Sequence, residues 1–250
     1  MGVDPALWAA ILAVTLFAGF VKGAVGFAMP MIMMSAFGSF LPNETALALL
    51  ILPTLVTNIA QGFRDGAAAM WDSLRTYRWH IAMVVIFLCI SAQFVHAIPD
   101  RAMKGLLGLP VFGFAVWQLL GLPLGIPLRH RRRAEVLLGI VGGLYGGISG
   151  IWGPPLIIYL VSIGAPKAEA IRVQGVVFLI GAAVLLPAHL VSGVLNSVTL
   201  PMSAAVAVPA MAGLWLGFRA QDRLNQQQFR RWTLVLLALT GANLLRQALF

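Results

Sequence analysis

A lysine lies within a glycine-rich interruption between two apolar stretches near the start of the chain. Between Gly19 and Pro30, Lys22 is followed by Gly23 and Gly26. An ammonium group among apolar residues is costly and normally faces a cavity or a partner, and the N-terminus of a broken helix adds partial positive charge. These features favour an anion site that contains Lys22, Gly23 and Gly26. The alternative is that the lysine extends from a segment end to a polar interface.

A second interruption carries no charge but contains two adjacent prolines. It consists of Gly150, Ile151, Trp152, Gly153, Pro154 and Pro155. Prolines lack the N–H donor and interrupt helix hydrogen bonds, so freed backbone groups in an apolar region would need a cavity or a ligand. Ser149, directly before this run, adds a hydroxyl group. The glycines among residues 142–147 are more typical of close helix packing.

Polar residues in two other apolar segments are candidates for the same site. Asn58 and Gln61 are three residues apart and share one helix face, while Arg172 and Gln174 open a segment in the second half of the chain. Asn58 fits a ligand contact and an interhelical hydrogen bond equally well. Gln61 and Arg172 lie near segment ends, where an interfacial position is the alternative.

Acidic residues avoid the middle of the apolar segments. All eight map to loops or segment edges: Asp4, Glu44, Asp65, Asp72, Asp100, Glu135, Glu169 and Asp222. A carboxylate-based cation site or proton relay is therefore not expected, and the remaining charge indicates an anionic ligand. Cys89 is the single cysteine, so a disulfide within the chain and a Cys-based metal site are excluded. No metal and no cofactor are expected.

An enzyme is the alternative outside transport. Residues 147–150 match the Gly-x-Ser-Gly of rhomboid-type intramembrane proteases, with Ser149 as nucleophile and His189 as a candidate base. The match is short, and no further His and Asn pair on a helix supplies an oxyanion site. We therefore assign Ser149 to a binding site and predict that the protein is not an enzyme.

The composition places these residues in a membrane. Of the 250 residues, 60% are hydrophobic and 10% charged, and the mean hydropathy is +0.91, whereas soluble domains carry roughly 25% charged residues. Apolar runs of spanning length recur without a polar block of domain size, which predicts one transmembrane domain over residues 1–250. The runs lack the alternation of a membrane barrel, so the predicted fold class is all-α. The predicted segments are 7–21, 26–40, 43–61, 79–98, 102–121, 134–148, 152–164, 170–191, 198–218 and 232–249, and the first shows no convincing cleavage site.

Glycines and prolines recur at a nearly fixed interval. Gly19, Gly23 and Gly26 recur as Gly146, Gly150 and Gly153 at an offset of 127 residues, and Pro42 with Ala46 recurs as Pro166 with Ala170 at 124. The interval predicts two similar halves, about residues 5–122 and 132–250. The offset of 127 also equates Ser149 with Lys22, which would bring a hydroxyl and an ammonium group to related positions across a pseudo-two-fold axis.

The distribution of positive charge distinguishes two topologies. Residues 7–40 would make a helix of about 51 Å, longer than a ~30 Å hydrocarbon core, so each interruption either kinks one crossing or returns the chain to its starting side. If the chain returns, thirteen of the 17 basic residues share one face of the membrane, and that face would be cytoplasmic. If each interruption is a single crossing, the two faces carry eight basic residues each. We therefore predict two inverted repeats, each a broken, re-entrant helix pair followed by three transmembrane helices.

These features resemble the sulfite exporter TauE/SafE family, which is also grouped with toluene sulfonate uptake permeases. The resemblance covers most of the chain and rests on Gly23, Gly26, Phe27, Pro30, Pro42, Ala46, Asn58, Ser149, Gly150, Gly153, Pro154, Pro155, Gly213, Gly217, Arg223 and Arg231. It implies a multi-pass carrier in a bacterial inner membrane for sulfite, sulfonates or related organosulfur anions.

The sequence therefore predicts a secondary transporter of a small, sulfur-containing anion that works by alternating access. Its predicted substrate-binding residues are Lys22, Gly23, Gly26, Asn58, Ser149, Gly150, Trp152, Gly153, Pro154 and Arg172. Export is favoured because an interior-negative potential drives an anion outward by about 2.3 kcal/mol per charge per 100 mV. The alternatives are an anion channel and the rhomboid-like protease. The expected partners are the anion and the lipid bilayer, without nucleic acid, and a homodimer is compatible with the sequence.

Overall fold

The computed structural model describes residues 5–97, 99–122 and 130–249, and every regular element in these ranges is a helix. The helices are α1 (Pro5–Val25), α2 (Met29–Phe37), α3 (Asn43–Gly62), α4 (Ala67–Thr76), α5 (Arg78–Ser91), the 3₁₀-helix η1 (Ala92–Ala97), α6 (Asp100–Leu119), α7 (Arg131–Ser149), α8 (Gly153–Ser162), α9 (Lys167–Val191), α10 (Thr199–Arg223) and α11 (Gln226–Leu249). The ten predicted segments coincide with these helices, with ends that differ by a few residues. Helix α4 lies outside them because it mixes apolar residues with Asp72 and Arg75.

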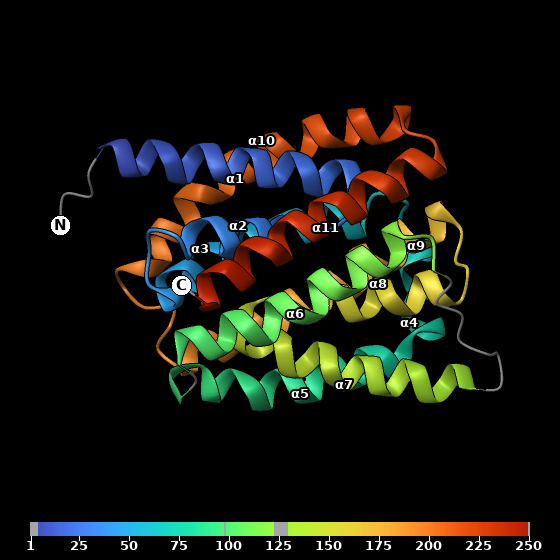
Figure 1. The fold of residues 1–250 in the computed structure, drawn as a ribbon, viewed down its shortest axis with the longest axis horizontal. Coiled ribbons are helices and arrows are strands. Elements are labelled where there is room, and N and C mark those ends of the chain that lie inside the picture. The colour runs from blue at the N-terminus through green and yellow to red at the C-terminus, as the bar shows by residue number, and fades with distance from the viewer. Residues whose placement is uncertain (1–4, 98, 123–129, 250) are drawn as a thin grey trace.

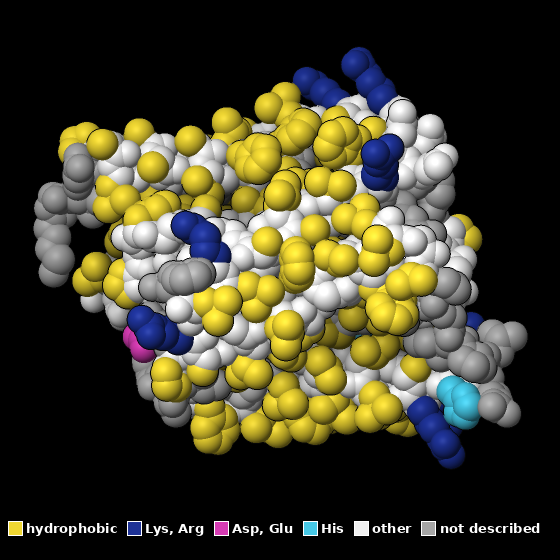
Figure 2. All heavy atoms as spheres, viewed as in Figure 1, with side chains coloured by type: hydrophobic (Ala, Val, Ile, Leu, Met, Phe, Trp, Pro, Cys, Tyr) yellow, Lys and Arg dark blue, Asp and Glu magenta, His cyan; other side chains and the backbone are white. Residues whose placement is uncertain are grey.

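The helices form a multi-pass membrane protein. Helices α1, α3, α9 and α10 are long and apolar enough to cross a membrane, and α4 and α5 with the start of η1 would form a further span with a bend of 81°. Hydrophobic side chains cover the middle of the visible face, while Lys and Arg lie toward its two ends (Figure 2). Leu109, Val208 and Leu239 are 65%, 73% and 63% exposed, as expected for side chains in contact with lipid. The predicted all-α membrane architecture is confirmed.

The helices lie side by side along the long axis of the molecule (Figure 1). Helix α1 packs against α10 along one edge, and α5 packs against α7 along the opposite edge. Between these edges α3 packs against α9 and α6 against α11. Exchanging the two halves of the chain converts the α1–α10 pair into the α7–α5 pair and maps the two inner pairs onto themselves. This is the contact pattern that two similar halves would produce.

Each predicted interruption separates a long helix from a short one. In the first break, residues 26–28, the chain leaves α1 through Gly26 at φ +88° and enters α2 after Ala28 at φ 74°. In the second break, residues 150–152, it leaves α7 through Gly150 at φ +70°. Glycine adopts such values without steric cost. Helix α2 packs against α1 and α8 packs against α7, which are the contacts expected if the chain turns back at each interruption.

The prolines have a different role from the predicted one. Pro30 lies in the first turn of α2, and Pro154 and Pro155 lie in the first turn of α8. First-turn N–H groups have no partner within a helix, and the fixed φ of proline suits this position. The prolines therefore begin the short helices and do not free additional backbone groups inside a longer one.

The two breaks also correct the predicted repeat register. Aligning residues 26–28 with 150–152 gives an offset of 124, the value already found for Pro42 and Pro166, and not 127. At 124 the counterpart of Lys22 is Gly146, and Ser149 corresponds to Val25. The prediction that Ser149 is the counterpart of Lys22 is therefore wrong. Glycines recur at nearly equal spacing on one helix face, so the two halves could be aligned three residues out of register.

Candidate functional site

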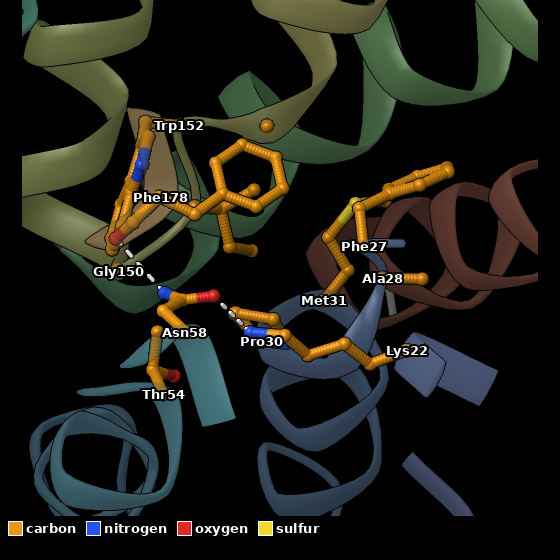
Figure 3. A pocket seen from close by; sticks show the side chains of 12 residues that line it. Lys22, Phe27, Ala28, Pro30, Met31, Thr54, Asn58, Gly150, Trp152 and Phe178 are labelled. Carbon is orange, nitrogen blue, oxygen red and sulfur yellow. Dashed lines mark hydrogen bonds between the residues drawn. The ribbon is translucent and has the colours of Figure 1, made fainter. Parts of the chain in front are cut away.

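A small cavity lies where the two breaks approach each other. We call it the central cavity, and Figure 3 shows its lining residues: Lys22, Phe27, Ala28, Pro30, Met31, Thr54, Asn58, Gly150, Ile151, Trp152, Gly153 and Phe178. They come from α1, α2, α3, α8, α9 and both breaks. The cavity volume is about 20 Å³, which is about the space that one water molecule needs. Of the predicted binding residues, Lys22, Asn58, Gly150, Trp152 and Gly153 meet here.

Lys22 is buried on α1, one turn before the first break. Its side chain is 1% exposed, and its Nζ donates a hydrogen bond to Oδ1 of Asn58 on α3. The alternative in which this lysine extends to an interface is therefore wrong. Among the residues that the structure describes, no acidic group forms an ion pair with Lys22. Since an ammonium group has three donors, a buried positive charge with a neutral partner is suited to an anion.

Two residues of α3 complete the polar wall of the central cavity. Asn58 Nδ2 donates to the carbonyl oxygen of Phe178 on α9 at 2.9 Å, which fixes the amide so that its oxygen faces Lys22. Thr54 lies one turn earlier, is 1% exposed, and its Oγ1 has no hydrogen-bond partner in the described structure. Lys22 and Thr54 therefore line one side with donors that an oxyanion could accept from, and Asn58 Oδ1 holds the ammonium group of Lys22 on that side. The spacing of Thr54 and Asn58 by four residues on one helix face is the sequence signal that would have identified Thr54.

The opposite wall is aromatic. The rings of Trp152 and Phe178 meet edge to face, with centroids 6.2 Å apart and planes at 86°. Gly181 of α9 leaves room for the indole, because a Cβ there would lie 2.6 Å from Trp152 Cε2 and 2.7 Å from its Nε1. Ile151 of the second break is also buried beside the cavity. Glycine at position 181 therefore allows a large aromatic side chain between the second break and α9.

Five predicted residues lie outside the lining of the central cavity. Gly23 faces α10, where an added Cβ would overlap the carbonyl oxygen of Leu214. Gly26 is the turn residue of the first break, and its carbonyl oxygen accepts from Gln61 Nε2 at 2.8 Å. Pro154 lines a separate cavity between α6, α7 and α8. These residues shape the helices around the central cavity without lining it.

Ser149 is used to close the end of α7. Its Oγ donates to the carbonyl oxygen of Tyr145 at 2.6 Å and accepts from the Ile151 N–H at 3.1 Å. The hydroxyl thus bonds the backbone on both sides of the second break and is fully buried. Neither bond involves an imidazole, so the contacts of Ser149 do not resemble those of an activated nucleophile.

Arg172 lies at a different cleft, at one end of the bundle. At this end, which we call the basic end, α3, α8 and α10 finish and α5, α7 and α9 begin. The cleft has a volume of about 310 Å³ and is lined by Gln61, Arg64, Asp65, Ala168, Ile171, Arg172, Gln221 and Asp222. Arg64 pairs with Asp222 at 2.8 Å and also donates to Gln221, while Arg172 Nε donates to Ser73 Oγ at 3.1 Å. Gln61, only 3% exposed, joins this cleft to the first break through its bond to Gly26.

Comparison with known protein families identifies the chain. The sequence model of the sulfite exporter TauE/SafE family matches residues 11–244. The chain belongs to this family. No curated protein and no solved structure gives a significant match. The matched range contains both breaks and every residue of the central cavity, so the resemblance predicted from the glycine-rich interruptions is confirmed. Membership places this TauE/SafE protein among membrane transporters of the sulfite and sulfonate exporter type.

Both ends of this TauE/SafE chain contain polar contacts outside the two cavities. At the opposite end, Asn243 and Gln247 of α11 donate to Ser35 of α2, and Lys104 of α6 donates to the carbonyl oxygen of Gly38 at 3.1 Å. At the basic end, Glu135 is 6% exposed and accepts from the His80 N–H at 3.2 Å. Glu135 lies at a segment edge as predicted, but it is buried against α5 and not exposed in a loop.

Proposed function

We propose that the protein is a secondary transporter that exports a small, sulfur-containing anion across a bacterial inner membrane. The observation that carries this proposal is the buried ammonium group of Lys22, which lines the central cavity with a neutral amide as its partner. Membership of a sulfite exporter family supports the sulfur-containing substrate. The export direction is supported by charge alone, since an interior-negative membrane potential drives an anion outward by about 2.3 kcal/mol per 100 mV.

Differences between the two ends of the molecule support alternating access. At the basic end, the cleft of about 310 Å³ leads inward to Gln61, which bonds the first break. At the opposite end, Ser35 of α2 is held to α11 by Asn243 Nδ2, which donates to its Oγ at 2.7 Å. Helix α8, the counterpart of α2, borders a cavity of about 70 Å³ between α6 and α7. Helix α2 is thus bound to α11, while α8 has space beside it. A carrier with alternating access would exchange these two states, so that α8 becomes bound and α2 becomes free.

The size of the central cavity favours a carrier over a channel. A cavity of about 20 Å³ holds about one water molecule and cannot hold a tetrahedral oxyanion without a change of conformation. Binding must therefore separate the two breaks. A channel would instead require a continuous opening past Lys22.

The proposed topology has inverted repeats with the basic end in the cytoplasm. Helix α1 begins at the left of the molecule and α7 at the right, so the two run in opposite directions (Figure 1). The ends of α3, α8 and α10 and the starts of α5, α7, α9 and α11 then share one end, which carries most of the Lys and Arg residues that the structure describes. In a Cys89→Ser background, cysteines at His130 and Asn225 should resist impermeant thiol reagents in intact cells, and a cysteine at Asn196 should react. Labelling of His130→Cys or Asn225→Cys without lysis would contradict the topology.

The direct test of the function is flux in liposomes. Purified protein should transport at least one anion among sulfite, sulfate, thiosulfate, small sulfonates and carboxylates, with saturation and with counterflow against unlabelled anion on the far side. Saturation and counterflow distinguish a carrier from a channel, whose flux would rise with concentration and show no counterflow. Absence of flux for every anion tested, in protein that is folded and inserted, would contradict the proposal.

A further inference from the structure

Arginine and tryptophan side chains gather on the surface of the basic end, apart from the cavities described above. Trp71 of α4 is 56% exposed and Trp79 of α5 is 37% exposed. The guanidinium carbon of Arg75 lies over the ring of Trp71, 5.1 Å from its centre. Those of Arg78 and Arg132 lie over Trp79, 5.7 and 4.6 Å from its centre. We call these five residues the Arg–Trp cluster, which joins α4, the start of α5 and the start of α7.

The three arginines of the Arg–Trp cluster have no carboxylate partner in the described part of the chain. The one ion pair found among the described residues involves none of them. Of the acidic residues on the neighbouring elements, Glu135 accepts from the His80 N–H and Glu169 accepts from the Tyr77 hydroxyl. Asp72 on α4 is exposed to solvent. The cluster therefore presents an excess of positive charge on an exposed surface, which suits an anionic partner.

The bend between α4 and α5 indicates where the cluster lies relative to the membrane. Helix α4 turns by 81° from α5 and the start of η1, so α4 lies nearly in the membrane plane when α5 crosses the membrane. Figure 1 shows α4 at the end of the molecule where α7 begins. Ile86, seven residues after Trp79 and on the same face of α5, is exposed as a side chain in contact with lipid would be. The cluster thus lies where the apolar surface ends, at the depth of the lipid headgroups, where tryptophan is common.

The inner face of α4 is already bound to the protein, which leaves its outer face for another partner. Ser73 is buried and accepts from Arg172 Nε at 3.1 Å, and Tyr77, directly after α4, donates to Glu169 Oε1 at 2.7 Å. Both partners belong to α9. Trp71 lies two residues from Ser73 along α4, on the opposite side, and is exposed. A short helix with one face bound to protein and a Trp and an Arg on the other is suited to lie in the membrane interface.

We infer that the Arg–Trp cluster is a binding site for the headgroups of anionic phospholipids. Guanidinium groups donate paired hydrogen bonds to phosphate, and a basic cluster at the membrane surface attracts anionic lipids. A zwitterionic headgroup brings its own cation and so leaves the charge of the arginines uncompensated. Because Arg78 and Arg132 belong to α5 and α7, headgroups bound beside Trp79 hold the starts of these two helices together. This site is separate from the central cavity and does not depend on which anion is transported.

Competition between two lipids tests the inference. The purified protein is placed in detergent micelles with equal amounts of phosphatidylglycerol and phosphatidylcholine, and native mass spectrometry measures which lipid the singly bound species retains. The wild type should retain mainly phosphatidylglycerol. Arg78→Gln and Arg132→Gln should each lower this preference about fivefold, and Arg132→Lys, which keeps the charge, should restore part of it. Inorganic phosphate should not displace phosphatidylglycerol, and displacement would show that the cluster binds free phosphate and not the lipid surface.

Arg223→Gln is the matched control, because Arg223 is exposed at the same end of the molecule, on α10, outside the cluster. It should change the lipid preference less than about twofold. Thermal unfolding gives a second measurement: phosphatidylglycerol should raise the Tm of the wild type and of Arg223→Gln, and should raise that of the Arg78→Gln and Arg132→Gln double variant less. In phosphatidylcholine alone the Tm values should agree, which shows that the variants fold.

Two results would overturn the inference. One is a wild-type protein that retains the two lipids equally. The other is an equal loss of preference in Arg223→Gln and Arg132→Gln, because the basic end would then attract anionic lipid through its overall charge and not through this cluster. Neither result bears on the transport of an anion through the central cavity, which the flux assay tests separately.

Discussion

The two breaks of this protein begin with the same glycine turn, but the side chains packed around them differ in chemistry. Each is three residues long, begins with a glycine at positive φ and leads into a short helix with proline in its first turn. Leu50 of α3 lies over Gly150, whereas its counterpart Gln174 of α9 lies over Gly26. The polar residue is again on the first break. The shared glycine turn and close helix contact serve the fold of both halves, while the proposed anion binding depends on the one charged side chain, Lys22.

The largest expected effect comes from removing the charge of Lys22, one turn before the first break. Lys22→Met keeps the apolar stem and removes the ammonium group, whose bond to an anion should contribute about 1.5–3 kcal/mol. Anion flux should fall roughly ten- to hundredfold, with normal insertion, and Lys22→Arg should retain part of it because its planar group fits the space differently.

Lys104→Met is the control for this prediction, because Lys104 donates to the Gly38 carbonyl oxygen outside the central cavity. It should leave the apparent affinity unchanged. Wild-type rate and affinity in Lys22→Met would show that the charged side of the first break does not bind the anion, and the site would then have to be sought in the basic-end cleft near Arg172.

The sequence predicted the helices well because each lies in an apolar run bounded by proline, glycine or charged residues. Hydropathy cannot show which face of a helix points inward, and this limited the prediction of the site. Lys22, Asn58 and Trp152 were found because a charge, an amide and an aromatic residue beside a break are unusual in an apolar segment. Thr54 and Phe178 were missed because threonine and phenylalanine are ordinary there, and only the packing of α3 and α9 around the breaks brings them together.

Ser149 and Arg172 show a second limit of the sequence. Each has a side chain suited to an anion, but the sequence did not reveal that local partners already occupy it. Ser149 bonds the backbone of Tyr145 and Ile151, and Arg172 bonds Ser73 of α4. Helix α4 was not predicted at all, so its contact with Arg172 could not be anticipated from the apolar pattern.

A smaller effect is expected where the two halves are alike, at the glycines that allow close packing. A Cβ at Gly23 would overlap the carbonyl oxygen of Leu214 on α10, and one at Gly147 would overlap that of Leu88 on α5. Backbone atoms cannot move aside as a flexible side chain can, so Gly23→Ala and Gly147→Ala should each destabilise the protein by about 1–3 kcal/mol. Thermal unfolding in detergent should show similar decreases in Tm for both variants.

Gly113→Ala is the matched control for these glycines, since no atom lies within 4 Å of its added Cβ. It should leave Tm unchanged or raise it slightly, because alanine favours a helix. A large decrease for one of the two packing variants and none for the other would show that the halves are packed differently despite their similar contacts.

The smallest expected effect is at the bond that distinguishes α2 from α8. Asn243→Ala removes the amide that donates to Ser35 Oγ and to its carbonyl oxygen and that accepts from Arg246, and leaves Gln247 in contact with the Ser35 carbonyl oxygen. Losing a neutral hydrogen bond costs about 1 kcal/mol, which would shift the equilibrium between bound and released α2 about fivefold. Met34 on α2 is 2% exposed, so Met34→Cys in a Cys89→Ser background reports the release. Thiol labelling from outside should become about fivefold faster with Asn243→Ala and stay unchanged with Asn225→Ala, which alters an exposed residue in the α10–α11 connection. Equal labelling rates with and without Asn243→Ala would mean that this bond does not hold α2 in place, and alternating access would need a different closing contact at this end.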